Sequence, residues 1–142
     1  MKSFRWAILD TNVVLRLALG DDTKQAYRAL DLVTANGKFF VVPDMAIYEA
    51  AYVLKSRYGY GRKKIVEILN TVLSQPRIDY DHEIFDKVFE DYQKYPKLSF
   101  ADCYMCALGK TRGWPVFTFD RKLANQCDMA REVPVKNISR DE

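Results

Sequence analysis

The sequence predicts an α/β fold, with a mainly parallel central sheet flanked by helices on both faces. Short apolar runs alternate with longer amphipathic segments, and no linker, repeat or low-complexity tract interrupts them. Strands separated by helices need crossover connections, which place neighbouring strands parallel. The length of 142 residues is typical of one domain. We therefore expect a single domain over residues 1–142.

The expected elements follow from apolar periodicity and from the turn residues that flank them. Strands are short apolar runs, expected at residues 4–9, 39–42, 77–80, 114–119 and 133–138. Helices carry apolar residues every three or four positions, expected at residues 13–19, 22–35, 44–58, 62–74, 81–95 and 99–112, with a short one from residue 120. Gly20 and Gly113 follow two of these helices, as helix-ending glycines do.

Composition excludes several classes of protein. With 49% hydrophobic and 29% charged residues, the chain is neither disordered nor fibrous. No apolar run approaches the roughly 18 residues of a membrane helix, and the run after Arg5 stops at Asp10, too early for a secretory signal. We expect a cytoplasmic protein. Its single histidine, His82, lies in a charged segment, so catalysis would have to rest on carboxylates.

The three cysteines, an odd number, give no closed disulfide framework. Cys103 and Cys106 form a C-x-x-C pair, but a structural zinc site needs four ligands, and the chain has no second such pair. Their spacing inside an apolar helical segment favours two thiols that pack in the core. A redox pair stays open as the alternative.

Three aspartates occupy positions where α/β proteins bind ligands, beyond the carboxyl ends of strands or at helix starts. Asp10 and Asp120 each follow an expected strand, and Asp102 ends the Ser99-Phe-Ala-Asp102 pattern of a capping box. Each has a plain alternative role as a helix cap.

Glu49 is the only charge in the apolar segment from Met45 to Leu54. A carboxylate among apolar neighbours is costly unless it is paired, protonated or bound to a cation, so a salt bridge and a metal site both stay open. Clustered carboxylates repel one another, and a divalent cation relieves that repulsion. Oxygen-only ligands favour Mg²⁺ or Mn²⁺.

These acids lie in four short motifs: Ile8-Leu-Asp-Thr-Asn12, the helix around Glu49, Leu98-Ser-Phe-Ala-Asp102 and Phe117-Thr-Phe-Asp120. In this order, and over nearly the whole chain, they resemble PIN-domain ribonucleases, most closely the VapC-type toxins of toxin–antitoxin pairs. The resemblance implies a parallel sheet with the first strand central and endonucleolytic cleavage of RNA. It implies a Mg²⁺ or Mn²⁺ site formed by Asp10, Glu49, Asp102 and Asp120, with supporting polar residues at Thr11 or Asn12 and at Thr118.

The resemblance also implies two protein partners, a small antitoxin and a second copy of the chain. The expected helices at 44–58 and 62–74 offer a binding surface for the antitoxin. The candidate contacts on it are Tyr48, Tyr52, Tyr58 and Tyr60. The same tyrosines could instead complete the core or a homodimer contact.

Basic residues near the acids are candidate contacts for RNA phosphates. The net charge is only +3, so local clusters matter more than the total. Arg121 and Lys122 are the best candidates, because they follow Asp120 directly.

Two other functions remain: a non-catalytic PIN-like module that binds a protein, and an aspartyl-phosphate phosphotransfer domain. The phosphatase-like pattern needs a second acid two residues after the first, where this chain has Asn12. Convergence of the four carboxylates in space would favour the nuclease.

Overall fold

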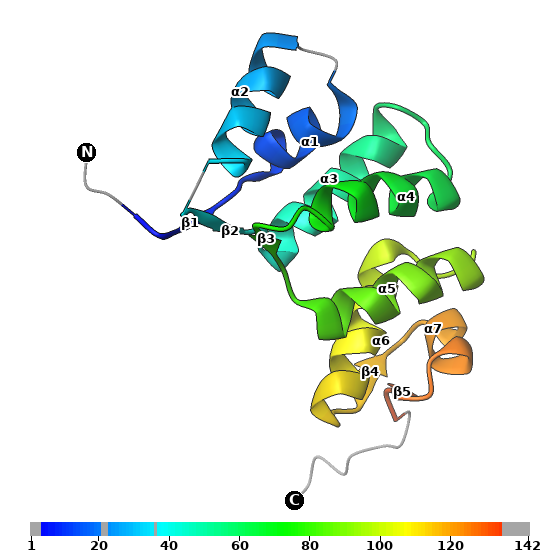
Figure 1. Ribbon diagram of the computed structural model, residues 1–142. Helices are drawn as coiled ribbons and strands as arrows, with labels where there is room; N and C mark the ends of the chain where they lie inside the picture. Colours follow the sequence, from blue (N-terminus) through cyan, green and yellow to red (C-terminus); the bar gives the residue numbers. More distant parts are fainter. Residues whose placement is uncertain (1–3, 21–22, 36, 135–142) are drawn as a thin grey trace, which may run out of the picture. The chain divides into compact units, whose positions relative to one another are not determined.

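The computed structural model describes residues 4–20, 23–35 and 37–134 (Figure 1). The chain divides into two compact units, Met1–His82 and Glu83–Glu142, and each is described by itself. All described strands pair in parallel, between flanking helices, which confirms the α/β fold class. The expectation of one domain over residues 1–142 stays a prediction.

The first unit holds a three-stranded sheet and four helices. Its elements are β1 (Trp6–Ile8), α1 (Thr11–Leu19), α2 (Thr23–Val33), β2 (Phe39–Val41), α3 (Asp44–Ser56), α4 (Arg62–Leu73) and β3 (Ile78–Asp79). The strand order is β1-β2-β3, in a register that pairs Ala7 with Phe40 and Phe40 with Ile78. Within this sheet β1 is an edge strand, whereas the resemblance implied a central one.

The core of the first unit explains why these segments fold against one another. Phe40 on β2, Ile47 and Leu54 on α3, and Ile65 and Leu69 on α4 are fully buried. The spacing of seven between Ile47 and Leu54, and of four between Ile65 and Leu69, places each pair on one face of its helix. Burying such a side chain contributes about 1.5–3 kcal/mol, so this face holds the helices on the sheet.

The second unit begins within the first turn of α5 (His82–Lys94) and continues with α6 (Phe100–Arg112), β4 (Val116–Thr118), α7 (Arg121–Gln126) and β5 (Ala130–Glu132). Strands β4 and β5 pair in parallel, Val116 with Ala130 and Thr118 with Glu132. The last strand therefore begins before the expected range of 133–138, of which residues 135–138 lie outside the described residues. Aromatic rings fill the core, where the ring of Tyr92 meets that of Phe100 edge-on at 5.1 Å between centroids.

A close approach joins α6 to the start of β4. A Cβ atom at Gly109 would lie 2.7 Å from the carbonyl oxygen of Trp114 and 2.9 Å from a methyl carbon of Val116. No side chain fits at such distances without a shift of the backbone, so glycine at this position lets the helix touch the strand.

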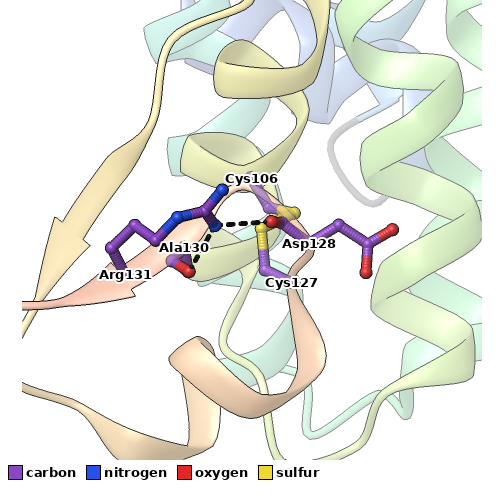
Figure 2. The surroundings of a disulfide bond; sticks show 5 residues. All are labelled: Cys106, Cys127, Asp128, Ala130 and Arg131. Atoms are coloured by element: carbon purple, nitrogen blue, oxygen red, sulfur yellow. Dashed lines mark hydrogen bonds between the residues drawn. A yellow bond between two sulfur atoms is a disulfide. The ribbon is translucent and has the colours of Figure 1, made fainter.

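A disulfide joins Cys106 on α6 to Cys127, which follows α7 (Figure 2). The expectation that Cys106 only packs as a thiol is therefore wrong, because folding brings a cysteine 21 positions away to its side. Cys103 is buried outside this bond, as expected for a packing residue. Beyond Cys127, the Arg131 guanidinium donates hydrogen bonds to the backbone oxygens of Asp128 (2.7 Å) and Ala130 (2.9 Å), which closes the turn into β5 (Figure 2).

The helix boundaries agree with the expected ones to within a few residues, and the capping residues explain why. Gly20 and Gly113 end α1 and α6 with φ of 62° and 71°, in the left-handed region that favours glycine. In the part of the chain that the structure describes, every helix is too short or too polar to cross a membrane.

Candidate active site

Asp10 lies directly after β1 and begins α1. Its Oδ1 accepts a hydrogen bond from the backbone N–H of Val13 at 3.1 Å, so the predicted helix cap is present. A carboxylate has two oxygens and about four lone-pair sites, and this cap occupies one of them. Asp10 is exposed to solvent, so its charge remains accessible to a ligand. The cap and a role as ligand are therefore compatible.

Asp10 and Glu49 meet at one cavity of about 340 Å³, called the acid cavity below. Asp10 comes from the start of α1 and Glu49 from the middle of α3, so two of the four predicted acids share a site. The acid cavity is lined by Asp10, Thr11, Asn12, Leu15, Glu49, Val53 and Arg57. Thr11 and Asn12, the predicted supporting residues, thus line the same cavity.

Glu49 differs from its expected environment, because its side chain is exposed. Its helical neighbour Met45 is exposed as well, to 66%. The expectation that Glu49 carries a costly charge among apolar neighbours is therefore wrong. What singles out Glu49 in the structure is its place beside Asp10 at the acid cavity.

Arg57 adds a positive charge to the acid cavity. It follows Glu49 and Val53 at intervals of four along α3, so all three side chains share one face of the helix. The sequence showed Arg57 only as part of a basic pair with Lys55, and the spacing of four was the signal that linked it to Glu49. A cavity with two carboxylates and one guanidinium can hold a cation and an anionic oxygen together.

Asp102 lies in the first turn of α6 and forms the predicted capping box with Ser99. The backbone N–H of Ser99 donates to Oδ2 of Asp102 at 3.0 Å, and the backbone N–H of Asp102 donates to Oγ of Ser99 at 3.0 Å. These reciprocal bonds fix the carboxylate at the helix start. Asp102 is half-buried.

Asp120 follows β4 and begins α7. Its Oδ1 accepts from the backbone N–H of Lys122 at 2.8 Å, and its own N–H donates to Oγ1 of Thr118 at 2.9 Å. Thr118 thus supports Asp120 through the backbone. Arg121 and Lys122 are exposed, and the Arg121 guanidinium lies 3.5 Å from the carboxylate of Glu132 on β5. An exposed pair of this kind contributes about 0–1 kcal/mol, so a phosphate can compete for Arg121.

Asp10 and Glu49 belong to the first unit, and Asp102 and Asp120 belong to the second. Within residues 4–20, 23–35 and 37–134, no three acidic, histidine or cysteine side chains group as metal ligands. The pairing of Asp10 with Glu49 is therefore what the structure adds to the prediction, and the joint role of all four acids stays a prediction. Carboxylates are hard oxygen donors, and Thr11 and Asn12 add further oxygens to the cavity that Asp10 and Glu49 line, a donor set that suits Mg²⁺ or Mn²⁺.

His82 lies at the exposed start of α5, away from the acid cavity lining. Its Nε2 is 3.5 Å from a carboxylate oxygen of Asp79, and its ring centroid is 3.9 Å from that of Tyr80. These contacts give the residue a local structural role, in agreement with the expectation from the sequence.

Asp10 and Asp120 follow parallel strands at helix starts, which is the position where α/β proteins commonly bind their ligands. The model of the PIN domain family matches residues 7–128, and the chain belongs to that family. This confirms the resemblance drawn from the four motifs.

The chain is also similar to two solved structures. One is VapC20 of Mycobacterium tuberculosis, described as a toxin that cleaves the sarcin–ricin loop, with 15% identity, a TM-score of 0.39, and coverage of 84% of this chain and 93% of that one. The other is PAE2754 of Pyrobaculum aerophilum, with 20% identity, a TM-score of 0.33, and coverage of 90% and 88%. No curated protein matches the chain.

Proposed function

We propose that this protein is a Mg²⁺- or Mn²⁺-dependent endoribonuclease, the toxin of a toxin–antitoxin pair that acts in the cytoplasm. The observation that carries the proposal is the acid cavity, where Asp10 and Glu49 meet in a chain of the PIN-domain family. In this proposal Asp102 and Asp120 complete the set of ligands. The oxygen-only donors and the placement of Asp10 and Asp120 after β1 and β4 support it.

The residues of the chain have distinct tasks in this reaction. The N–H of Val13 and the capping box of Ser99 hold Asp10 and Asp102 in fixed orientations, which lowers the cost of assembling the charged site. When bound, the cation acidifies water and screens the charge on the scissile phosphate. Arg121 and Lys122 bind phosphate oxygens beside Asp120.

The proposal includes two protein partners, an antitoxin and a second copy of the chain. Tyr52 is 62% exposed on α3, and Tyr48 and Tyr58 are each 39% exposed. The rings of Tyr58 and Tyr60 stack with their centroids 5.7 Å apart, which presents a flat aromatic surface. Tyrosines are common in protein interfaces, because the apolar ring packs while the hydroxyl stays accessible to water. These residues therefore support the proposal that the antitoxin binds α3 and the segment after it.

Cleavage of a single-stranded RNA by the purified chain, in Mn²⁺ and in EDTA, tests the activity. We expect cleavage only with the metal, and a loss by orders of magnitude in Asp10→Asn and in Asp102→Asn, because each removes a charge at nearly constant shape. Asp31→Asn is the matched control, since this exposed aspartate on α2 lies outside the acid cavity lining.

Wild-type protein that leaves RNA intact in Mn²⁺ would favour the non-catalytic binding module. Metal-dependent cleavage that persists in the double variant Asp10→Asn, Asp102→Asn would indicate a contaminating nuclease. Equal losses in Asp10→Asn and Asp31→Asn would mean that total charge, and not the site, controls the reaction.

A further inference from the structure

Two further hollows adjoin the acid cavity along α1. Asn12 lines both the acid cavity and a second hollow of about 430 Å³, which lies between α1 and α2 and is also lined by Arg16, Gln25 and Arg28. Arg16 in turn lines a third hollow of about 270 Å³ that reaches Tyr27. Asn12 and Arg16 are one helical turn apart, so the hollows form a track along one side of α1. We call the second hollow the α1–α2 groove.

The α1–α2 groove carries positive charge beside the acids. The charged residues that line it, among those the structure describes, are Arg16 and Arg28. The Nε of Arg16 donates to Oε1 of Gln25 at 2.6 Å, which directs the guanidinium across the groove from α1 towards α2. Arg28 is exposed on α2. Two guanidinium groups at one hollow recognise anionic oxygens, because the planar fork matches phosphate geometry.

Tyr27 gives the track a feature that a simple anion site lacks. Its ring is 66% exposed in the third hollow, next to Leu30. Proteins that bind single-stranded nucleic acid combine a cationic groove for the backbone with exposed aromatic rings on which bases stack. The sequence of features along α1 is therefore acid cavity, two arginines and an aromatic ring, which suits a polyanion that carries flat bases.

We propose that the α1–α2 groove binds the backbone of the RNA strand next to the scissile bond, with phosphates on Arg16 and Arg28 and a base stacked on Tyr27. This inference rests on the proposed nuclease function and extends it, because it assigns the path by which the strand leaves the acid cavity. RNA affinity should then depend on residues that take no part in the chemistry.

Anisotropy of a fluorescein-labelled single-stranded RNA, titrated with the full chain in EDTA over a range of salt concentrations, tests the groove without cleavage. Each lost phosphate contact should reduce the slope of log K against log salt by about 0.7 for a single strand. We expect that reduction in Arg28→Gln, and about twice that in the double variant Arg16→Gln, Arg28→Gln. The matched control is Lys63→Gln, Lys64→Gln, which removes two exposed charges from α4, outside all three hollows.

The stacking role of Tyr27 has its own pair of variants. Tyr27→Ala should weaken RNA binding by roughly 5- to 160-fold, the range typical of one stacked base. Tyr27→Phe should restore binding, because it keeps the ring. Equal RNA binding by Tyr27→Ala and wild type would show that no base stacks on the Tyr27 ring.

Other results would contradict the proposal that the α1–α2 groove binds RNA. They are an unchanged salt slope in the double arginine variant, a larger change in the α4 control, and wild-type protein that does not bind RNA. An unchanged slope would mean that this hollow serves a protein partner or none. Because Arg28 is exposed, Arg28→Gln should fold, and it decides the question if Arg16→Gln fails to do so.

Hydrolysis of a small activated phosphodiester in Mn²⁺ separates this inference from the nuclease proposal. Such a substrate reaches the acid cavity but cannot extend into the groove, so Arg28→Gln should hydrolyse it at the wild-type rate. Wild-type protein that hydrolyses neither this substrate nor RNA, yet binds RNA through the groove, would refute the proposed nuclease activity and still support RNA binding by the groove.

Discussion

Breaking the Cys106–Cys127 bond should destabilise the second unit by an amount that follows from chain entropy. The two cysteines are 21 positions apart, and a cross-link that closes a loop of this length removes about 3.3 kcal/mol of conformational freedom from the unfolded chain at 25 °C. With an m value of about 1–2 kcal/mol/M, the urea midpoint should fall by roughly 1.5–3 M when the bond is reduced.

The two tryptophans allow this change to be assigned to the second unit. Trp6 lies in the first unit and Trp114 in the second. In the Trp6→Phe background, the fluorescence of Trp114 therefore reports the second unit alone. We expect its urea midpoint to fall when a phosphine reductant is added.

Two cysteine variants serve as controls. Cys127→Ala should unfold at the same urea concentration with and without the reductant, because it cannot form the bond. Cys103→Ala should keep the full response, since its thiol is outside the disulfide.

Alkylation under denaturing conditions checks the bond itself. Of the three cysteines, one should react before reduction and all three after it. Three reactive thiols in unreduced protein, or a wild-type midpoint that ignores the reductant, would refute this reasoning.

Three further predictions concern packing, charge and metal. Gly109→Ala should lower the free energy of unfolding by about 1–3 kcal/mol, because the new methyl would meet a backbone oxygen at 2.7 Å, and urea denaturation measures it. Gly61→Ala, which has nothing within 4 Å, should lower it by about 0.5–1 kcal/mol, because Gly61 is the N-cap of α4 and alanine is a poorer cap. Burial raises the pKa of Asp91 above its usual 3.8, partly opposed by the charge of Lys110. The folded state therefore loses stability as pH rises from 3.8 through the folded-state pKa, so Asp91→Asn should be more stable than wild type at pH 7 and equal to it at a pH well below 3.8. An equal gain in stability at both pH values would contradict this direction of the pKa shift. Mn²⁺ at a hundredfold excess over its Kd should stabilise the wild type by about 2.7 kcal/mol, seen as a higher Tm, and Asp10→Asn should reduce that gain; a wild-type Tm that ignores Mn²⁺ would count against the site.

The elements were predictable because local signals and packing agree. Gly20 and Gly113 end their helices in the left-handed region, and Ser99 caps α6 together with Asp102. These signals act over three or four residues, so they can be read from the chain directly. The parallel pairing of the strands followed from the helices between them.

Other features depend on tertiary contacts, so they could not be predicted from the sequence. The partner of Cys106 is set by how α7 returns to α6, which no spacing rule encodes. Glu49 was expected among buried residues, but apolar side chains such as Met45 also cover protein surfaces, so an apolar neighbourhood in sequence does not imply burial. The last strand was placed in the β-branched run after Glu132, whereas pairing with β4 selects residues 130–132.

The caps at Asp10 and Asp120 have a consequence for how this protein can change over evolutionary time. Asparagine caps a helix about as well as aspartate does, and its side-chain oxygen can replace the one that accepts from Val13 or Lys122. A single G-to-A transition in an aspartate codon makes that replacement. The gene is therefore one nucleotide away from encoding a folded chain that lacks one of the proposed acidic ligands. Such a chain would keep the tyrosines of α3 that we propose as antitoxin contacts, so under that proposal an inactive copy could persist in a genome as a competitor for the antitoxin.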